Sequence, residues 1–69
     1  MHLARLRRLE KQVDDDQAII RMVERDGTRF FATNASGMLA DVTGSRVAEC
    51  RTRINFMREL IQAARRAAL

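Results

Sequence analysis

Apolar residues recur at helical spacing at the start of the chain. Leu3, Leu6, Leu9 and Val13 are three or four positions apart, and charged residues fill most of the positions between them. This spacing predicts an amphipathic helix. Three aspartates follow at positions 14–16. Because the helix macrodipole disfavours negative charge at a helix C-terminus, we expect the first helix to end there.

The segment before Gly27 has two interpretations. Asp26-Gly27 is a strong hairpin turn signal, and β-branched and aromatic residues flank it. This pattern predicts an antiparallel pair of strands over residues 18–25 and 28–33, which is the interpretation we prefer. The alternative continues the first helix to Arg25, with Gly27 as its C-cap. The sequence leaves open whether residues 17–25 are helix or strand.

A second turn and a long helix complete the expected fold. Asn and Gly stand at the first and fourth positions of residues 34–37, as a type I turn favours, and a third short strand is expected over 38–42. Thr43 or Ser45 offers an N-cap, and no helix breaker occurs over residues 46–69. The sequence predicts one α+β domain over residues 1–69: a helix, a short antiparallel β-hairpin or meander, and a long C-terminal helix.

The expected C-terminal helix carries two apolar stripes. One follows a heptad pattern: Val47, Cys50, Ile54, Met57, Ile61, Ala64 and Ala68. The other lies beside it: Phe56, Leu60, Ala63 and Ala67. Together they are wider than one core contact requires, so we expect one stripe to pack inside the chain and the other on a second copy; the alternative packs both inside. The predicted dimer interface comprises Val47, Ile54, Met57, Leu60, Ile61 and Ala64.

Composition supports a small folded domain without catalytic chemistry. The chain has 69 residues, of which 46% are hydrophobic and 32% charged. A chain this short buries little surface, so oligomerisation is expected to stabilise it. Cys50 and His2 are the only residues of their types, which excludes an internal disulfide and a zinc site within the chain. We therefore expect no enzyme activity, no metal and no cofactor.

Charge and aromatic content indicate the class of partner. Thirteen basic and nine acidic residues give a net charge of +4, but Trp and Tyr are absent. Binding to single-stranded nucleic acid favours aromatic platforms, so nucleic acid is not the expected partner. No apolar run is long enough to span a membrane, which favours a cytoplasmic protein. The residues expected to bind a protein partner are Phe30, Phe31, Met38 and Leu39, with Arg29 and Arg58.

In its size and composition, the whole chain resembles the small early proteins of transposable Pseudomonas phages, a family that includes quorum-sensing anti-activators. The resemblance implies a homodimeric inhibitor in the host cytoplasm. Such a protein sequesters a host regulatory protein, such as a LuxR-type transcriptional activator, and can also block the pilus assembly ATPase. Residues 23–33 are locally similar to the hairpin of the lambdoid phage head-tail joining protein W, a small helix-hairpin-helix protein, although this chain inserts residues 35–44 before its second helix.

The leading hypothesis is therefore a phage-encoded, non-enzymatic inhibitor that acts by binding a host protein. A small basic DNA-binding regulator is the first alternative, because of the positive charge. A phage head-tail connector protein is the second, because of the local similarity. DNA binding would weaken steeply with salt, which distinguishes the first alternative from an inhibitor.

Overall fold

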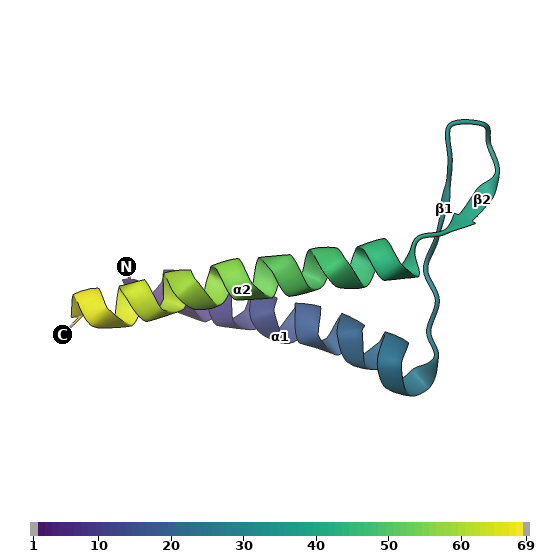
Figure 1. The fold of residues 1–69 in the computed structure, drawn as a ribbon. Helices are drawn as coiled ribbons and strands as arrows, with labels where there is room; N and C mark the ends of the chain where they lie inside the picture. The colour runs from purple at the N-terminus through teal and green to yellow at the C-terminus, as the bar shows by residue number, and fades with distance from the viewer. Residues whose placement is uncertain (1, 69) are drawn as a thin grey trace.

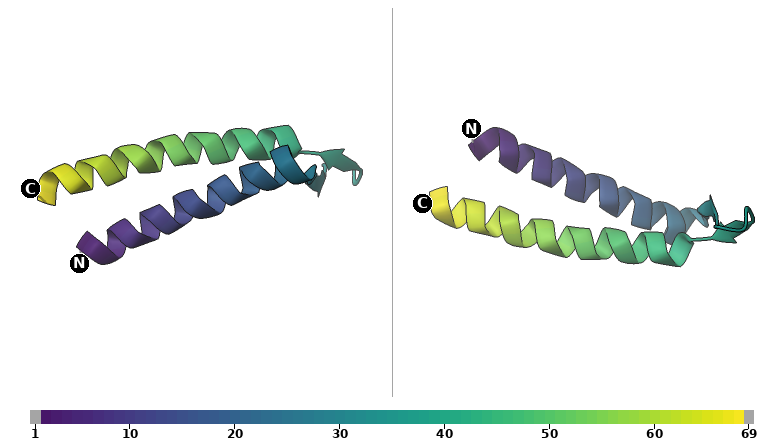
Figure 2. Two further views of the ribbon diagram at one scale, coloured as in Figure 1. Left: turned by 90° about the horizontal axis from the view of Figure 1, so that it is seen from below. Right: turned by 90° about the horizontal axis from the view of Figure 1, so that it is seen from above.

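The computed structural model describes residues 2–68 as a helical hairpin with a small β-hairpin at its closed end (Figure 1). The elements in chain order are α1 His2–Asp26, β1 Phe31–Thr33, β2 Leu39–Asp41 and α2 Thr43–Ala68. The two helices run antiparallel and side by side, and the described chain begins and ends far from the β-hairpin (Figure 2). The molecule is elongated, with extents of 51 × 28 × 16 Å. The expected order of helix, hairpin and long C-terminal helix is confirmed.

The first helix is about twice as long as the preferred interpretation predicted. The strand expected over residues 18–25 is wrong, because α1 continues through Asp26. Gly27 then adopts a left-handed conformation with φ of 70°, and the Thr28 N–H donates to the Met22 carbonyl oxygen at 3.0 Å. Gly27 thus terminates α1, as the alternative interpretation predicted, and it does not form a hairpin turn.

Packing against α2 explains why α1 does not stop at the three aspartates. The spacing of three and four continues from Val13 through Asp16 to Ile20 and Val23, so the same face of α1 remains turned toward α2. Leu6, Leu9 and Ile20 pack against the buried cluster. Asp14 and Asp15 are exposed, and only Asp16 is buried. This tertiary contact overrides the local turn preference of Asp26-Gly27.

The β-hairpin forms around the second predicted turn. The Gly37 N–H donates to the Asn34 carbonyl oxygen at 2.9 Å, and Gly37 has φ of 81°. The Asn34 side-chain oxygen accepts hydrogen bonds from the N–H groups of Ser36 and Met38, both at 3.0 Å. The predicted turn over residues 34–37 and a strand within 38–42 are confirmed. The strand expected over 28–33 is shorter than predicted, and it pairs with β2.

The core is a single narrow seam between the helices. Its buried apolar side chains are Val13, Cys50, Ile54, Met57 and Ile61. Four of the five belong to the heptad stripe of α2, which therefore packs on α1 of the same chain. The predicted helix over residues 46–69 begins earlier, at Thr43, while Leu69 lies outside the described residues.

We expect Ile54→Ala to lower the free energy of unfolding by about 3 kcal/mol, because it opens a cavity in this seam. Leu39→Ala removes the same type of group from a side chain that is 73% exposed, and should cost less than about 0.5 kcal/mol. Denaturant titration of the two variants measures the difference. Equal losses would contradict this assignment of the core.

Candidate protein-binding surface

The β-hairpin carries the largest group of exposed apolar side chains. Phe31, Met38 and Leu39 are 59%, 66% and 73% exposed, respectively. The β-hairpin extends beyond the ends of both helices, so its outer part has no contact with the helical seam (Figure 1). We call these three residues the tip residues. Exposed apolar groups concentrated in one projecting element are typical of a surface that binds another protein.

The strand register places the tip residues on both faces of the β-hairpin. Phe31 pairs with Asp41 and Thr33 pairs with Leu39, and cross-strand partners lie on the same face. Phe31 and Leu39 are therefore diagonal neighbours on one face. Met38 is adjacent to Leu39 in sequence, so it belongs to the opposite face. A partner could contact the tip from either side.

The carboxylate of Asp41 holds the base of the β-hairpin. One oxygen accepts hydrogen bonds from Nε and Nη2 of Arg29, at 3.1 and 2.7 Å. The other accepts from the N–H and hydroxyl of Thr43, at 2.9 and 2.6 Å. These hydrogen bonds, those of Thr43 foremost, lower the pKa of Asp41 to about 2. Asp41 thus caps the start of α2, a role that the sequence analysis assigned to the hydroxyl of Thr43 or Ser45.

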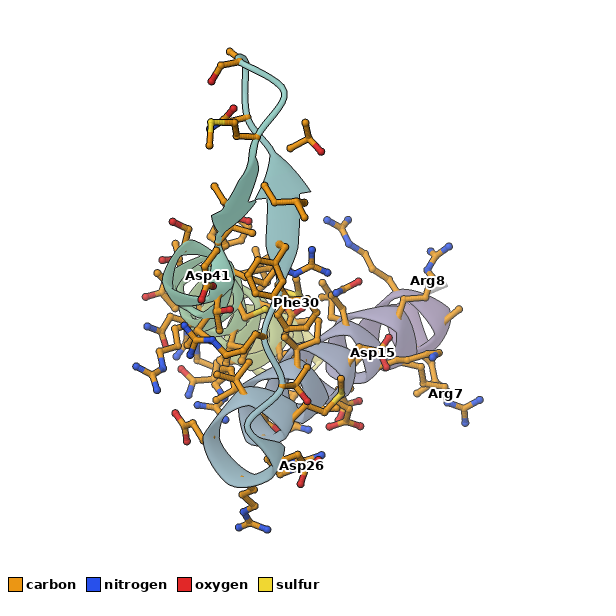
Figure 3. All side chains as sticks on the ribbon, turned by 90° about the vertical axis from the view of Figure 1, so that its right-hand side faces the viewer. Arg7, Arg8, Asp15, Asp26, Phe30 and Asp41 are labelled. Carbon is orange, nitrogen blue, oxygen red and sulfur yellow. The ribbon has the colours of Figure 1, made fainter. Side chains whose placement is uncertain are left out.

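Phe30 joins the β-hairpin to the helices. Its N–H donates to the Thr43 hydroxyl oxygen at 2.8 Å, and the guanidinium carbon of Arg46 lies 5.0 Å from the centre of its ring. Phe30 is half-buried where the β-hairpin meets the helices, whereas Arg7 and Arg8 extend away from the body of the molecule (Figure 3). The β-hairpin is therefore anchored at its base while its tip remains exposed.

The structure separates the six residues predicted to bind a partner into three groups. Phe31, Met38 and Leu39, the tip residues, are all exposed on the β-hairpin: Met38 and Leu39 lie next to its turn, and Phe31 lies opposite Asp41 at the start of β1. Arg29 and Phe30 belong to the anchored base of the β-hairpin. Arg58 is exposed in the middle of α2, fifteen residues beyond its first residue, and is not part of this surface.

The residues predicted for the dimer interface lie mainly inside the chain. Ile54, Met57 and Ile61 are buried against α1, and Val47, Leu60 and Ala64 are half-buried. The first three have almost no surface left for a second copy in this conformation. The stripe beside them remains accessible: Phe56 is 60% exposed, and Ala63 and Ala67 are also exposed.

A buried ion pair, which the sequence analysis did not identify, joins the two helices. Arg53 donates to Asp16 through Nε at 2.7 Å and through Nη2 at 2.9 Å, and Gln12 Nε2 adds a hydrogen bond at 3.3 Å. The Asp16 side chain is 1% exposed and that of Arg53 is 43% exposed. The hydrogen bonds from Arg53 are the main reason that the pKa of Asp16 is lowered. The sequence does contain a signal for this pair. Asp16 occupies a position at which the apolar spacing of α1 predicts a buried side chain, and a buried charged residue requires a partner.

Other site chemistry is limited in the part of the chain that the structure describes. Residues 2–68 contain no group of three His, Cys, Asp or Glu side chains that could hold a metal ion. Cys50 is buried, and burial raises the pKa of its thiol. Neither described helix has the length and apolar character needed to cross a membrane.

Comparison with known proteins adds no relative: no family model, no curated protein and no solved structure matches the chain. The surface must therefore be interpreted from its own geometry.

Acid should destabilise the fold through Asp16. A carboxylate whose pKa is lowered in the folded state contributes stability above its usual pKa of 3.8, and this contribution is lost as the pH falls through the lowered value. We expect Asp16→Asn to cost about 2 kcal/mol at neutral pH and to flatten the decline in unfolding free energy below about pH 4.

The adjacent residue supplies the control for this measurement. The Asp15 side chain is 57% exposed and pairs only with Lys11 at 3.5 Å, so Asp15→Asn should keep the wild-type profile. Denaturant titrations across this pH range would contradict the assignment if both variants flattened the profile equally.

Proposed function

We propose that the chain is a non-enzymatic protein-binding protein that contacts its partner through the tip residues. The observation that carries this proposal is the high exposure of Phe31, Met38 and Leu39 on an element whose base is fixed by hydrogen bonds. Aromatic residues and Met are enriched at protein interfaces, and a few well-packed residues carry most of the affinity. A pre-oriented β-hairpin loses less conformational entropy on binding than a flexible loop, which also favours this role.

The resemblance to early proteins of transposable phages supplies the biological context of the proposal. In that context, the chain is a phage-encoded inhibitor that acts in the host cytoplasm by sequestering a host regulatory protein. A LuxR-type quorum-sensing activator is the first candidate partner, and the pilus assembly ATPase is the second. A phage head-tail connector protein remains the alternative proposal; residues 23–26 of the similar stretch belong to α1, and the β-hairpin begins at Phe31.

We further propose that the protein acts as a homodimer through its helices. A compact monomer of 7.9 kDa exposes about 4,400 Å², whereas this chain exposes 5492 Å². The surplus of about 1,100 Å² exceeds the roughly 800 Å² per partner that a stable interface buries. The stripe of Phe56, Leu60, Ala63 and Ala67 is the apolar helical surface best suited to this contact. Packing there would turn two hairpins into a four-helix bundle.

Phe56→Glu should convert the dimer into a monomer, because it places a charge in the apolar contact. Gln62→Glu is the matched control: it adds the same charge at an exposed position outside the stripe and should leave the dimer intact. Light scattering coupled to size-exclusion chromatography reports the mass. A folded wild-type species of 7.9 kDa at micromolar concentration would overturn the dimer.

Truncation at the tip should weaken partner binding without unfolding the protein. We expect Leu39→Ser or Phe31→Ala to weaken binding to a purified LuxR-type activator by about thirtyfold, equivalent to about 2 kcal/mol. Met22→Ala, at a side chain on α1 that is 39% exposed, should leave the affinity unchanged.

Calorimetric titration measures these affinities, and thermal melts check the fold. If the tip variants bound as tightly as the wild type, or if they lost their cooperative melt, the tip would not be the binding surface.

A further inference from the structure

Charged residues at intervals of seven link the helices along one side of the hairpin. Glu10 of α1 pairs with Arg65 of α2 at 3.2 Å, and Glu24 pairs with Arg51. The positions midway between these pairs are Gln17 on α1 and Arg58 on α2. On α1, the middle position of the series therefore has an amide, whereas the two flanking positions have carboxylates. Within residues 2–68, Arg58 makes no ion pair.

A hollow opens beside this middle position. It has a volume of about 260 Å³ and is lined by Gln17, Ile20, Arg51, Ile54, Asn55 and Arg58. Two guanidinium groups and two amides can donate hydrogen bonds, and the two isoleucines supply apolar walls. No acidic side chain is among these described lining residues. The neighbouring hollow on the other side of Gln17 and Arg58 differs, because Glu10 and Asp14 line it.

We propose that this hollow, which we call the arginine hollow, binds a carboxylate from an aspartate or glutamate of the protein partner. This proposal rests on the proposed protein-binding function and identifies the chemistry of a second contact. Guanidinium groups bind carboxylates through two parallel hydrogen bonds, and Asn55 and Gln17 can donate to the remaining oxygen lone pairs.

The size and walls of the hollow support a protein side chain as its occupant. Small-molecule sites occupy roughly 300–1,000 Å³, so a hollow of about 260 Å³ is better suited to a single side chain. Ile20 and Ile54 can contact the methylene groups of a glutamate, which a free inorganic anion lacks. Glu24 pairs with Arg51, whereas Arg58 has no ion-pair partner among residues 2–68, so we expect Arg58 to be the main donor to the carboxylate.

The test uses the 69-residue chain and two blocked tripeptides. Each peptide has one central residue between alanine and leucine, which is glutamate in the probe and glutamine in the control. Nuclear magnetic resonance follows the side-chain amides of Gln17 and Asn55 and the guanidinium of Arg58. We expect the glutamate peptide to shift these signals and to bind at least about fivefold more tightly than the glutamine peptide.

Two variants test the site itself. Gln17→Glu supplies a carboxylate from α1 and should pair with Arg58, so it should weaken peptide binding about fivefold without lowering the melting temperature. Arg58→Gln should weaken binding by a similar factor. The matched controls are Gln62→Glu and Arg66→Gln, which change the same groups at exposed positions outside the hollow and should bind as the wild type does.

The outcomes separate this proposal from the proposed function. Unchanged binding by Gln17→Glu and Arg58→Gln, or equal shifts at every exposed arginine, would overturn the arginine hollow. Tighter binding of inorganic phosphate than of the glutamate peptide would also overturn it, because the site would then select a free anion. Leu39→Ser should leave peptide binding unchanged, so the tip and the arginine hollow can fail independently.

Discussion

The ion pair between Asp16 and Arg53 sets the register on which the rest of the molecule depends. A carboxylate that is 1% exposed requires a charged or hydrogen-bonding partner, and loss of that partner is strongly destabilising. A slide of one heptad would keep the repeating apolar stripes of two antiparallel helices facing each other. Such a slide would separate Arg53 from Asp16. The same register brings Glu10 to Arg65 and Glu24 to Arg51, and it places the ends of the helices where the β-hairpin can connect them.

Because the core is a single seam, the proposed dimer would link assembly to stability. Each helix packs on one neighbour only, so the fold has a radius of gyration of 15.5 Å, where a compact domain of this length has about 11 Å. The heptad stripe of α2 is used inside the chain, and Phe56 remains exposed beside it. A dimer interface at Phe56 would add a second apolar layer, between the two copies, to the single layer between α1 and α2. Stability would then depend on protein concentration.

Local signals predicted the parts of the fold that local interactions determine. The turn at residues 34–37 follows from Asn34 and Gly37, and α2 follows from a long apolar period without breakers. Local signals left the length of α1 open between two interpretations, because the partner of Asp16 is thirty-seven residues away in sequence. The candidate site divides similarly. The tip residues were among those expected from the sequence to bind a partner, whereas the Asp41 network joins residues from separate segments that only the folded chain brings together.

The tip and the seam use different residues, so the binding proposed for the tip would not weaken the fold. No tip residue contributes to the buried cluster, and the cluster residues do not reach the β-hairpin. The connection between the two regions is polar: Arg29, Asp41 and Thr43 fix the direction of the β-hairpin relative to α2. An exposed apolar β-hairpin can promote self-association. Its strands have only three residues each, so their edges are too short to pair extensively with another chain. The net charge of +4 adds repulsion between copies, which also favours a tip that remains exposed.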